Sequence, residues 1–172
     1  MAIDPVYAFS GADIRARFDA QVEPMMTQIR ATPEDWTWTF HRDPEDLCAN
    51  RRTALERFLV DYDQGKSERR YLTGELPALP FEPDSFGLAV CSHLLFLYSD
   101  LLTEDFHVRA VLELCRVARD VRIFPLLTLA RKPSPYIGAV QKAVESQGWT
   151  GSVEGVNYEL QRGGNEMLRI VK

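Results

Sequence analysis

Three reactive side chains stand next to one another in the sequence, at Cys91, Ser92 and His93. They lie at the end of the run "GLAVCS" (87–92), whose unbroken apolar start is typical of a parallel-sheet strand covered on both faces. Ligands of open α/β sheets bind in the crevice at the carboxyl ends of the strands, so we expect the three side chains at such a crevice. The competing interpretation is structural: a small buried cysteine, a serine that caps the next turn and a histidine without a site role.

Two carboxylates are further candidates for ligand binding. Asp4 ends the segment "AID", which is expected to be a short strand, and a carboxylate at that position can accept hydrogen bonds from both hydroxyls of a ribose. An ordinary Asp-Pro turn with Pro5 is the alternative. Glu75 precedes the loop "LPALPF" and could face an adenine amino group, or it is simply a solvated loop acid.

Several other kinds of chemistry lack their usual motif. There is no serine-nucleophile elbow, no G-x-x-x-x-G-K phosphate loop and no pair of histidines at metal-ligand spacing. Cys48, Cys91 and Cys115 lack C-x-x-C spacing, as expected of reduced thiols in a cytoplasm. The net charge of -5 gives no reason to expect a nucleic-acid partner, and neither a signal peptide nor a membrane span is recognisable. These features predict a cytoplasmic protein without a metal site or a membrane partner.

The elements that must position these residues alternate between helices and strands. A helix is expected from Ser10 with Pro24 kinking or dividing it, and another runs from Leu47 to Gly65, after Asp43-Pro44, which is a helix N-terminus signal. The pattern predicts an α/β fold with a mostly parallel sheet and an antiparallel last strand, in one domain over residues 1–172. Residues 10–65 form a helical insertion, and 70–172 form the C-terminal half of the sheet. The other predicted elements are helices over 103–118 and 134–148, strands "YLTGEL", "GLAVCS" and "DVRIFPLLTL", and a hairpin of "SVEGVNYEL" and "EMLRIVK" joined around Gly163-Gly164.

Several stretches of the sequence resemble the motifs of a known family. "LPALPFEPDSFGLAVCSHLLFLY" (76–98) is similar to the motif of class I S-adenosylmethionine-dependent methyltransferases in which L-P-F, an acidic turn and S-F-D-L-V lead into the fourth strand. "VNYELQRGGNEMLRI" resembles that fold's sixth and seventh strands. Together with "DPVYAFS", "FLVDYDQGKSERRY", "CSHLLFLYS", "VRIFPLL" and "GGNEML", these stretches resemble a bacterial subgroup with an unassigned acceptor. The resemblance covers nearly the whole chain and implies a Rossmann-like methyltransferase fold.

The resemblance also implies roles for individual residues. Asp4 matches the acid after the second strand that binds the ribose hydroxyls, and Glu75 with Leu76 falls about where the family contacts adenine. Cys91 matches the end of the fourth strand, beside the sulfonium of S-adenosylmethionine. Ser92 and His93 are then expected at the methyl-transfer site, with His93 as a base if the unknown acceptor carries a hydroxyl or a protonated amine.

Two departures from the family pattern bear on activity. Gly87 stands where the family has Asp, and the family's first strand and glycine-rich loop would have to precede Asp4, where the sequence begins. In the family that first strand lies between the second and fourth strands, so the strand over 87–92 is expected to lack a neighbour. Truncation is the favoured explanation; the alternatives are direct pairing of "AID" with that strand, or its coverage by another chain in a homodimer.

Two functions are therefore expected from the sequence. The first is methyl transfer from S-adenosylmethionine by in-line displacement, which depends mainly on positioning and desolvation. The second is a non-catalytic remnant that serves as a binding or scaffolding domain. A nucleotide-binding protein with another cofactor ranks last, because the phosphate loop is missing.

Overall fold

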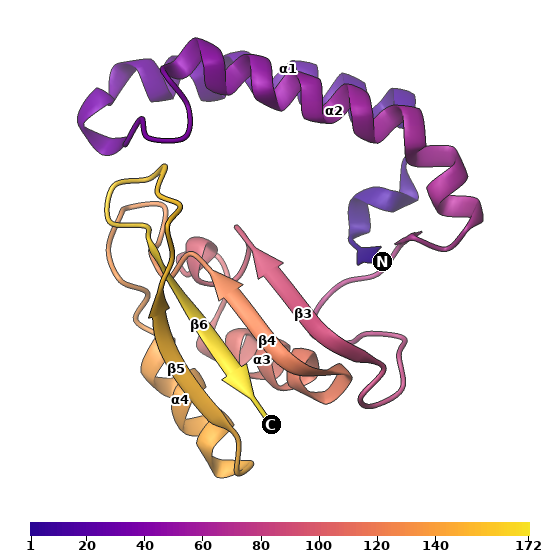
Figure 1. Cartoon of the computed structure of the whole chain (residues 1–172), viewed down its shortest axis with the longest axis vertical. Helices are drawn as coiled ribbons and strands as arrows, with labels where there is room; N and C mark the ends of the chain where they lie inside the picture. The colour runs from indigo at the N-terminus through magenta and orange to yellow at the C-terminus, as the bar shows by residue number, and fades with distance from the viewer. The chain divides into compact units, whose positions relative to one another are not determined.

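The computed structural model describes all 172 residues, which divide into an N-terminal unit, Met1–Glu75, and a C-terminal unit, Leu76–Lys172 (Figure 1). The boundary falls just before the proline-containing loop "LPALPF". No helix has both the length and the apolar composition that crossing a bilayer requires.

The C-terminal unit contains a four-stranded mixed sheet with the order β3-β4-β6-β5. β3 (Phe86–Ser92) and β4 (Ala118–Phe124) are parallel, whereas β6 (Glu166–Val171) is antiparallel to both β4 and β5 (Thr150–Gly155). The antiparallel last strand is confirmed. The mostly parallel sheet is not, because the chain's end returns between β4 and β5 and makes two of the three strand pairings antiparallel.

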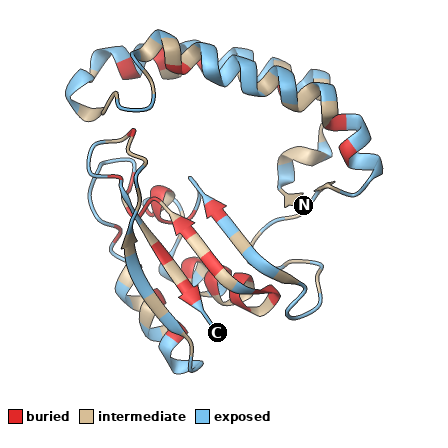
Figure 2. Ribbon diagram, in the orientation of Figure 1, coloured by how far each residue is buried: buried red, intermediate tan, exposed pale blue.

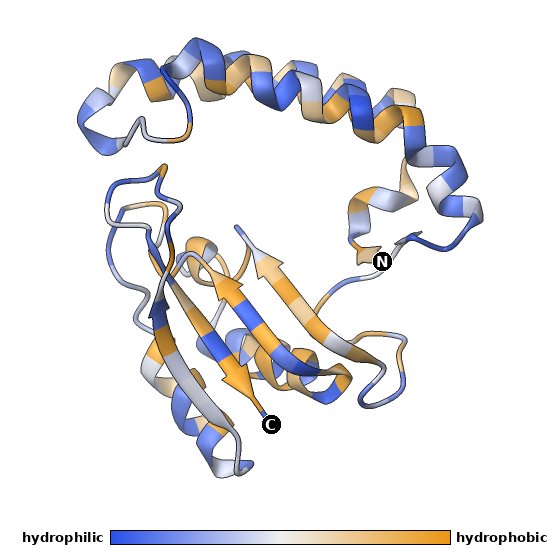
Figure 3. Ribbon diagram, viewed as in Figure 1, coloured by the Kyte–Doolittle hydropathy of each residue, from blue (hydrophilic) through white to orange (hydrophobic).

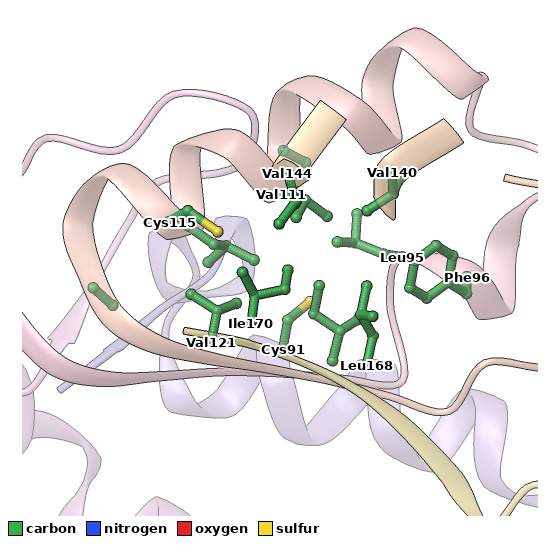
Figure 4. Close-up of a cluster of buried hydrophobic side chains, with 14 of the residues drawn as sticks. Cys91, Leu95, Phe96, Val111, Cys115, Val121, Val140, Val144, Leu168 and Ile170 are labelled. Atoms are coloured by element: carbon green, nitrogen blue, oxygen red, sulfur yellow. The ribbon is translucent and has the colours of Figure 1, made fainter. Parts of the chain in front are cut away.

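Helices cover one face of this sheet (Figure 1). These are α3 (Glu104–Val117) and α4 (Ile137–Ser146), and their apolar residues meet the inward residues of the strands in one hydrophobic core (Figure 4). Thr103 caps α3 by accepting a hydrogen bond from the backbone N–H of Phe106, as its position before the apolar run predicts. The buried residues labelled in Figure 4 are Cys91, Leu95, Phe96, Val111, Cys115, Val121, Val140, Val144, Leu168 and Ile170.

The opposite side of β3 is uncovered within the C-terminal unit, which corrects the prediction of a strand buried on both faces. Leu88 and Val90 are 48% and 65% exposed, whereas Cys91 is buried in the core. Figure 2 shows that much of β3 is exposed, whereas buried residues predominate along β4. The apolar run alone could not reveal this, because burial of a strand's second face depends on what packs there.

Three predicted strands extend too far, and "YLTGEL" is a strand only over Tyr71–Leu72. β4 ends at Phe124 because Pro125 cannot donate to the ladder, so 125–129 form a loop. β5 ends at Gly155, and residues 156–165 form a longer connection than a tight hairpin at Gly163-Gly164 would need. Gly163 does take a left-handed conformation, with φ of +80°, within that connection.

The N-terminal unit is built on two long helices, α1 (Gly11–Ala31) and α2 (Pro44–Ser67). Ser10 forms a capping box with Asp13 at the start of α1, and Asp43 caps α2, as expected from the sequence. α1 continues through Pro24 as one helix, so this proline does not divide it. α2 also passes through Gly65, its predicted end, and stops two residues later.

Short segments complete this unit. β1 (Ala2–Ile3) pairs in parallel with β2 (Tyr71–Leu72), forming a separate two-stranded sheet. The "AID" segment therefore does not pair with β3, which rules out that alternative for this structure. The 3-10 helices are η1 (Pro5–Ala8) and η2 (Pro33–Asp35) here, and η3 (Phe96–Tyr98) in the C-terminal unit.

Candidate functional site

The strongest site candidate lies at the carboxyl end of β3. Ser92 Oγ and His93 Nδ1 are 2.7 Å apart and form a hydrogen bond, and both residues are exposed. The backbone N–H of His93 donates to the carbonyl of Phe124 at 2.7 Å, which ties this point to the end of β4. His93 has a φ of +56°, a left-handed conformation that L-residues other than glycine adopt at a cost of about 1–2 kcal/mol. Strained backbone of this kind is often retained at functional sites.

The imidazole of His93 lies against one aromatic ring, which contacts a second. The ring of His93 meets that of Phe124 edge-on, with centroids 5.5 Å apart, and Phe124 in turn contacts Tyr158 with centroids 6.1 Å apart. The ends of β3 and β4 and the 156–165 connection are thereby brought together. The sequence did not indicate Tyr158 as a site residue, because "VNYEL" was predicted to be part of a strand. The one local signal at this place was Pro125, which marks the end of β4 beside it.

Cys91 does not join this pair of side chains. Adjacent residues of a strand point to opposite faces, so its thiol enters the core while Ser92 faces outward. Burial raises the pKa of the Cys91 thiol, which keeps it protonated and unreactive at neutral pH. The predicted proximity of Cys91, Ser92 and His93 as one polar group is wrong for the cysteine side chain.

Asp4 lies at the carboxyl end of β1, as predicted. Its Oδ1 accepts a hydrogen bond from the backbone N–H of Val6 at 2.8 Å and so caps η1, which means that the turn interpretation also holds. Its backbone N–H donates to the carbonyl of Leu72, which fixes it beside β2. Because a carboxylate offers about four acceptor sites, the cap leaves capacity for a ligand.

Glu75 and Leu76 fall on either side of the boundary between the units. Glu75 is exposed, as its interpretation as a loop acid expects, and Leu76 packs partly against the C-terminal core. Asp4 and Glu75 therefore belong to the N-terminal unit, whereas Leu76, Cys91, Ser92 and His93 belong to the C-terminal unit. Their cofactor-binding and catalytic roles stay predictions.

The loops beside His93 are held by polar residues that no motif in the sequence indicated. Ser99 and Ser134 share a hydrogen bond of 2.7 Å, and both are buried, so the segment after β3 is fastened to the segment after β4. Gln161 donates to the carbonyl of Thr128 and adds the 156–165 connection to the same framework. These contacts give the site a defined support instead of three independent loops.

Two further features concern metals and buried titratable groups. No three His, Cys, Asp or Glu side chains are grouped in a way that could hold a metal ion. His107 is fully buried, and its Nδ1 donates to the carbonyl of Thr103 at 2.8 Å. Its ring stacks on the ring of Phe96, so it belongs to the packed interior of the C-terminal unit.

Comparison with known proteins adds little to this geometry. No protein-family model matches the chain, and no solved structure matches it. An uncharacterized protein of Methanocaldococcus jannaschii is 25% identical over 168 residues, which cover 97% of this chain and 73% of that protein. The likeness extends over both units but carries no functional information.

Proposed function

We propose that the chain has the fold of class I S-adenosylmethionine-dependent methyltransferases and takes part in methyl transfer to an acceptor that is still unknown. The observation that carries the proposal is the strand order. In the family, the sixth and seventh strands form a terminal antiparallel pair, and the first strand lies between the second and fourth. The sequence resemblance matches β1 to the second strand, β3 to the fourth, and β5 and β6 to the sixth and seventh.

The observed pairings are consistent with that match. β6 is antiparallel to β4 and β5, and β1 pairs with β2 in a sheet separate from β3. β5 and β6 thus form the antiparallel pair that the match expects of the sixth and seventh strands. This agreement in strand direction supports the match.

Residues in each unit have chemistry that suits the proposal. Asp4 would bind the ribose hydroxyls through acceptor capacity that the η1 cap does not use. The cofactor supplies an electrophilic methyl group, and the protein's work is to orient the acceptor and receive its proton. In the tautomer whose Nδ1–H donates to Ser92 Oγ, Nε2 carries the free lone pair and is the nitrogen that would accept that proton.

The proposal is tested first by calorimetric titration of the folded chain with S-adenosylhomocysteine. Saturable binding is expected, and Asp4→Asn should weaken it about tenfold, or about 1.4 kcal/mol, because asparagine keeps the helix cap but loses the charged acceptor. Glu145→Gln, on the surface of α4, is the matched control and should bind like the unmodified chain. Absence of binding by a chain shown to be folded would contradict the proposal and favour a scaffolding role.

A second experiment addresses the base. Once an acceptor is identified, His93→Ala should lower turnover by about 10²–10⁴-fold, the usual range for a general base, while affinity for S-adenosylhomocysteine stays the same. Ser92→Ala should give a smaller loss, because it removes only the group that orients the ring. Unchanged turnover in His93→Ala would remove the base assignment without touching the fold proposal.

A further inference from the structure

β3 has a hydrogen-bonding partner on one side only. Within the C-terminal unit it forms the edge of the sheet next to β4. Along a strand, the backbone N–H and C=O groups of successive residues point alternately to one neighbouring strand and to the other. The backbone N–H of His93 donates to the carbonyl of Phe124, so the odd-numbered residues of β3 direct their backbone groups toward β4. Leu88 and Val90 therefore direct their backbone N–H and C=O groups away from the sheet, along a free edge.

The two edges of this sheet differ in chemistry. β5, the other edge strand, contains two glycines and the charged Glu154, which are typical of an edge protected against pairing. β3 carries none of these protective charges, and no Asp, Glu, Lys or Arg occurs from Ser85 to Leu95. Figure 3 shows the contrast: apolar colouring dominates β3, whereas β5 is mostly pale or hydrophilic. Leu88 and Val90 also expose their side chains along this edge.

We propose that the free edge of β3 in this 172-residue chain pairs with β3 of a second copy. The two strands run antiparallel about a twofold axis at Ala89 and join two four-stranded sheets into one. The inference goes beyond the proposed function and does not depend on it.

The register explains why a second copy fits. With the axis at Ala89, Leu88 lies opposite Val90 of the partner subunit, and the reverse pair follows by symmetry. Both residues direct their backbone groups outward, so each pair exchanges two hydrogen bonds at a Cα separation of about 5.5 Å. The exposed apolar side chains then meet on one face as cross-strand pairs. Because the stretch is uncharged, two identical strands approach without like-charge repulsion.

The same geometry predicts a closed dimer. A twofold contact uses the β3 edge of each copy once. The only other edge of the sheet is β5, where Glu154 and glycines oppose further pairing. Association should therefore stop at two copies and should not continue into fibres.

The first test is sedimentation equilibrium of the full chain over a range of concentrations. The unmodified chain should show a monomer–dimer equilibrium, and Val90→Lys should raise the dimer dissociation constant at least tenfold, because it sets a charge opposite an apolar residue. Thr150→Lys adds the same charge to the exposed start of β5 and should dimerise like the unmodified chain. Circular dichroism of each variant shows whether the fold is retained.

The second test locates the contact. Amide hydrogen exchange at Leu88 and Val90 should slow as the protein concentration rises. In Val90→Lys, the amides at positions 88 and 90 should exchange fast at every protein concentration. A chain that remains monomeric at its highest soluble concentration overturns the proposal. A dimer that leaves these two amides unprotected, or that is equally stable in Val90→Lys, overturns it as well.

Discussion

The two units of this protein are stabilised in different ways. In the C-terminal unit, buried residues from β3, β4, β6, α3 and α4 form one continuous apolar core. In the N-terminal unit, α1 and α2 bury few side chains between them, among them Met26 and Leu47. The ion pairs Arg15–Glu56 and Arg52–Asp19 join the two helices. Most residues of α1 and α2 are exposed.

Aromatic packing at one end of the helix pair supplies what the N-terminal unit lacks in core. Tyr7, Phe58, Tyr62 and Tyr71 are in mutual contact, and the buried Tyr62 hydroxyl donates toward the carbonyls of Tyr7 and Phe9. Exposed ion pairs contribute little, typically up to about 1 kcal/mol each, so this cluster matters more than the many charges. A long helix pair can thus depend on a few residues at one end.

The largest effect is expected in the C-terminal core. Leu168 is fully buried in β6, a central strand, and Leu168→Ala should lower the free energy of unfolding by about 2–5 kcal/mol through lost burial and a cavity. Hydrogen exchange followed by peptide mass spectrometry should show faster exchange in β4 and β6 but unchanged exchange in α1 and α2. Leu129→Ala, at an exposed position, is the control and should change little. Equal loss of protection in both units would mean that they unfold as one.

An intermediate effect is expected for two glycines that occur in helices of different units. A Cβ at Gly65 would overlap the ring of Tyr71, so Gly65→Ala should destabilise the N-terminal unit by about 1–3 kcal/mol. Gly138 in α4 has open space, and Gly138→Ala should be neutral or stabilising by up to about 1 kcal/mol. Urea denaturation of both variants checks the pair. A neutral Gly65→Ala would show that the aromatic cluster can rearrange.

The smallest effect concerns acid. Hydrogen bonds from Arg70 and Tyr71 lower the pKa of Asp61 in the N-terminal unit to about 2, and those from Arg122 and Arg169 lower the pKa of Asp120 in the C-terminal unit to about 2. Because an unfolded aspartate titrates near about 3.9, each contribution is complete above about pH 4 and is lost as the pH falls toward 2.

Single substitutions separate the two units in this experiment. Asp61→Asn should flatten the acid dependence of exchange in α2 and β2, and Asp120→Asn should do so in β4 and β6. Both carboxylates are partly exposed, so the changes should be modest and should shrink further in high salt. An acid profile unchanged in both variants would show that other carboxylates control unfolding at low pH.

Local signals in the sequence predicted the local structure well. Ser10, Asp43-Pro44 and Thr103 begin helices where their capping chemistry indicated, whereas the strand predicted to run through Pro125 ends before it. The hydrogen bond between Ser92 and His93 was anticipated only as proximity. Their adjacency in the chain made it possible, and the left-handed backbone at His93 lies at the same strand end.

Features that depend on distant segments were not predictable in the same way. Whether Leu88 is covered depends on what packs against β3, and the strand's composition is the same in either case. The hydrogen bond between Ser99 and Ser134 joins residues 35 positions apart, and no periodicity links them. The direction of the Cys91 side chain follows from strand alternation, but only once the side of the sheet that carries helices is known.

The left-handed backbone at His93 has a consequence for how this position can evolve. Selection for heat resistance alone would favour glycine there, because glycine adopts a φ of +56° without steric cost. Selection for the chemistry of an imidazole would keep histidine in spite of that cost. A library of variants at position 93, selected once for heat resistance and once for activity, should therefore return glycine in the first case and histidine in the second. The difference between the two outcomes would measure how much the imidazole contributes to activity.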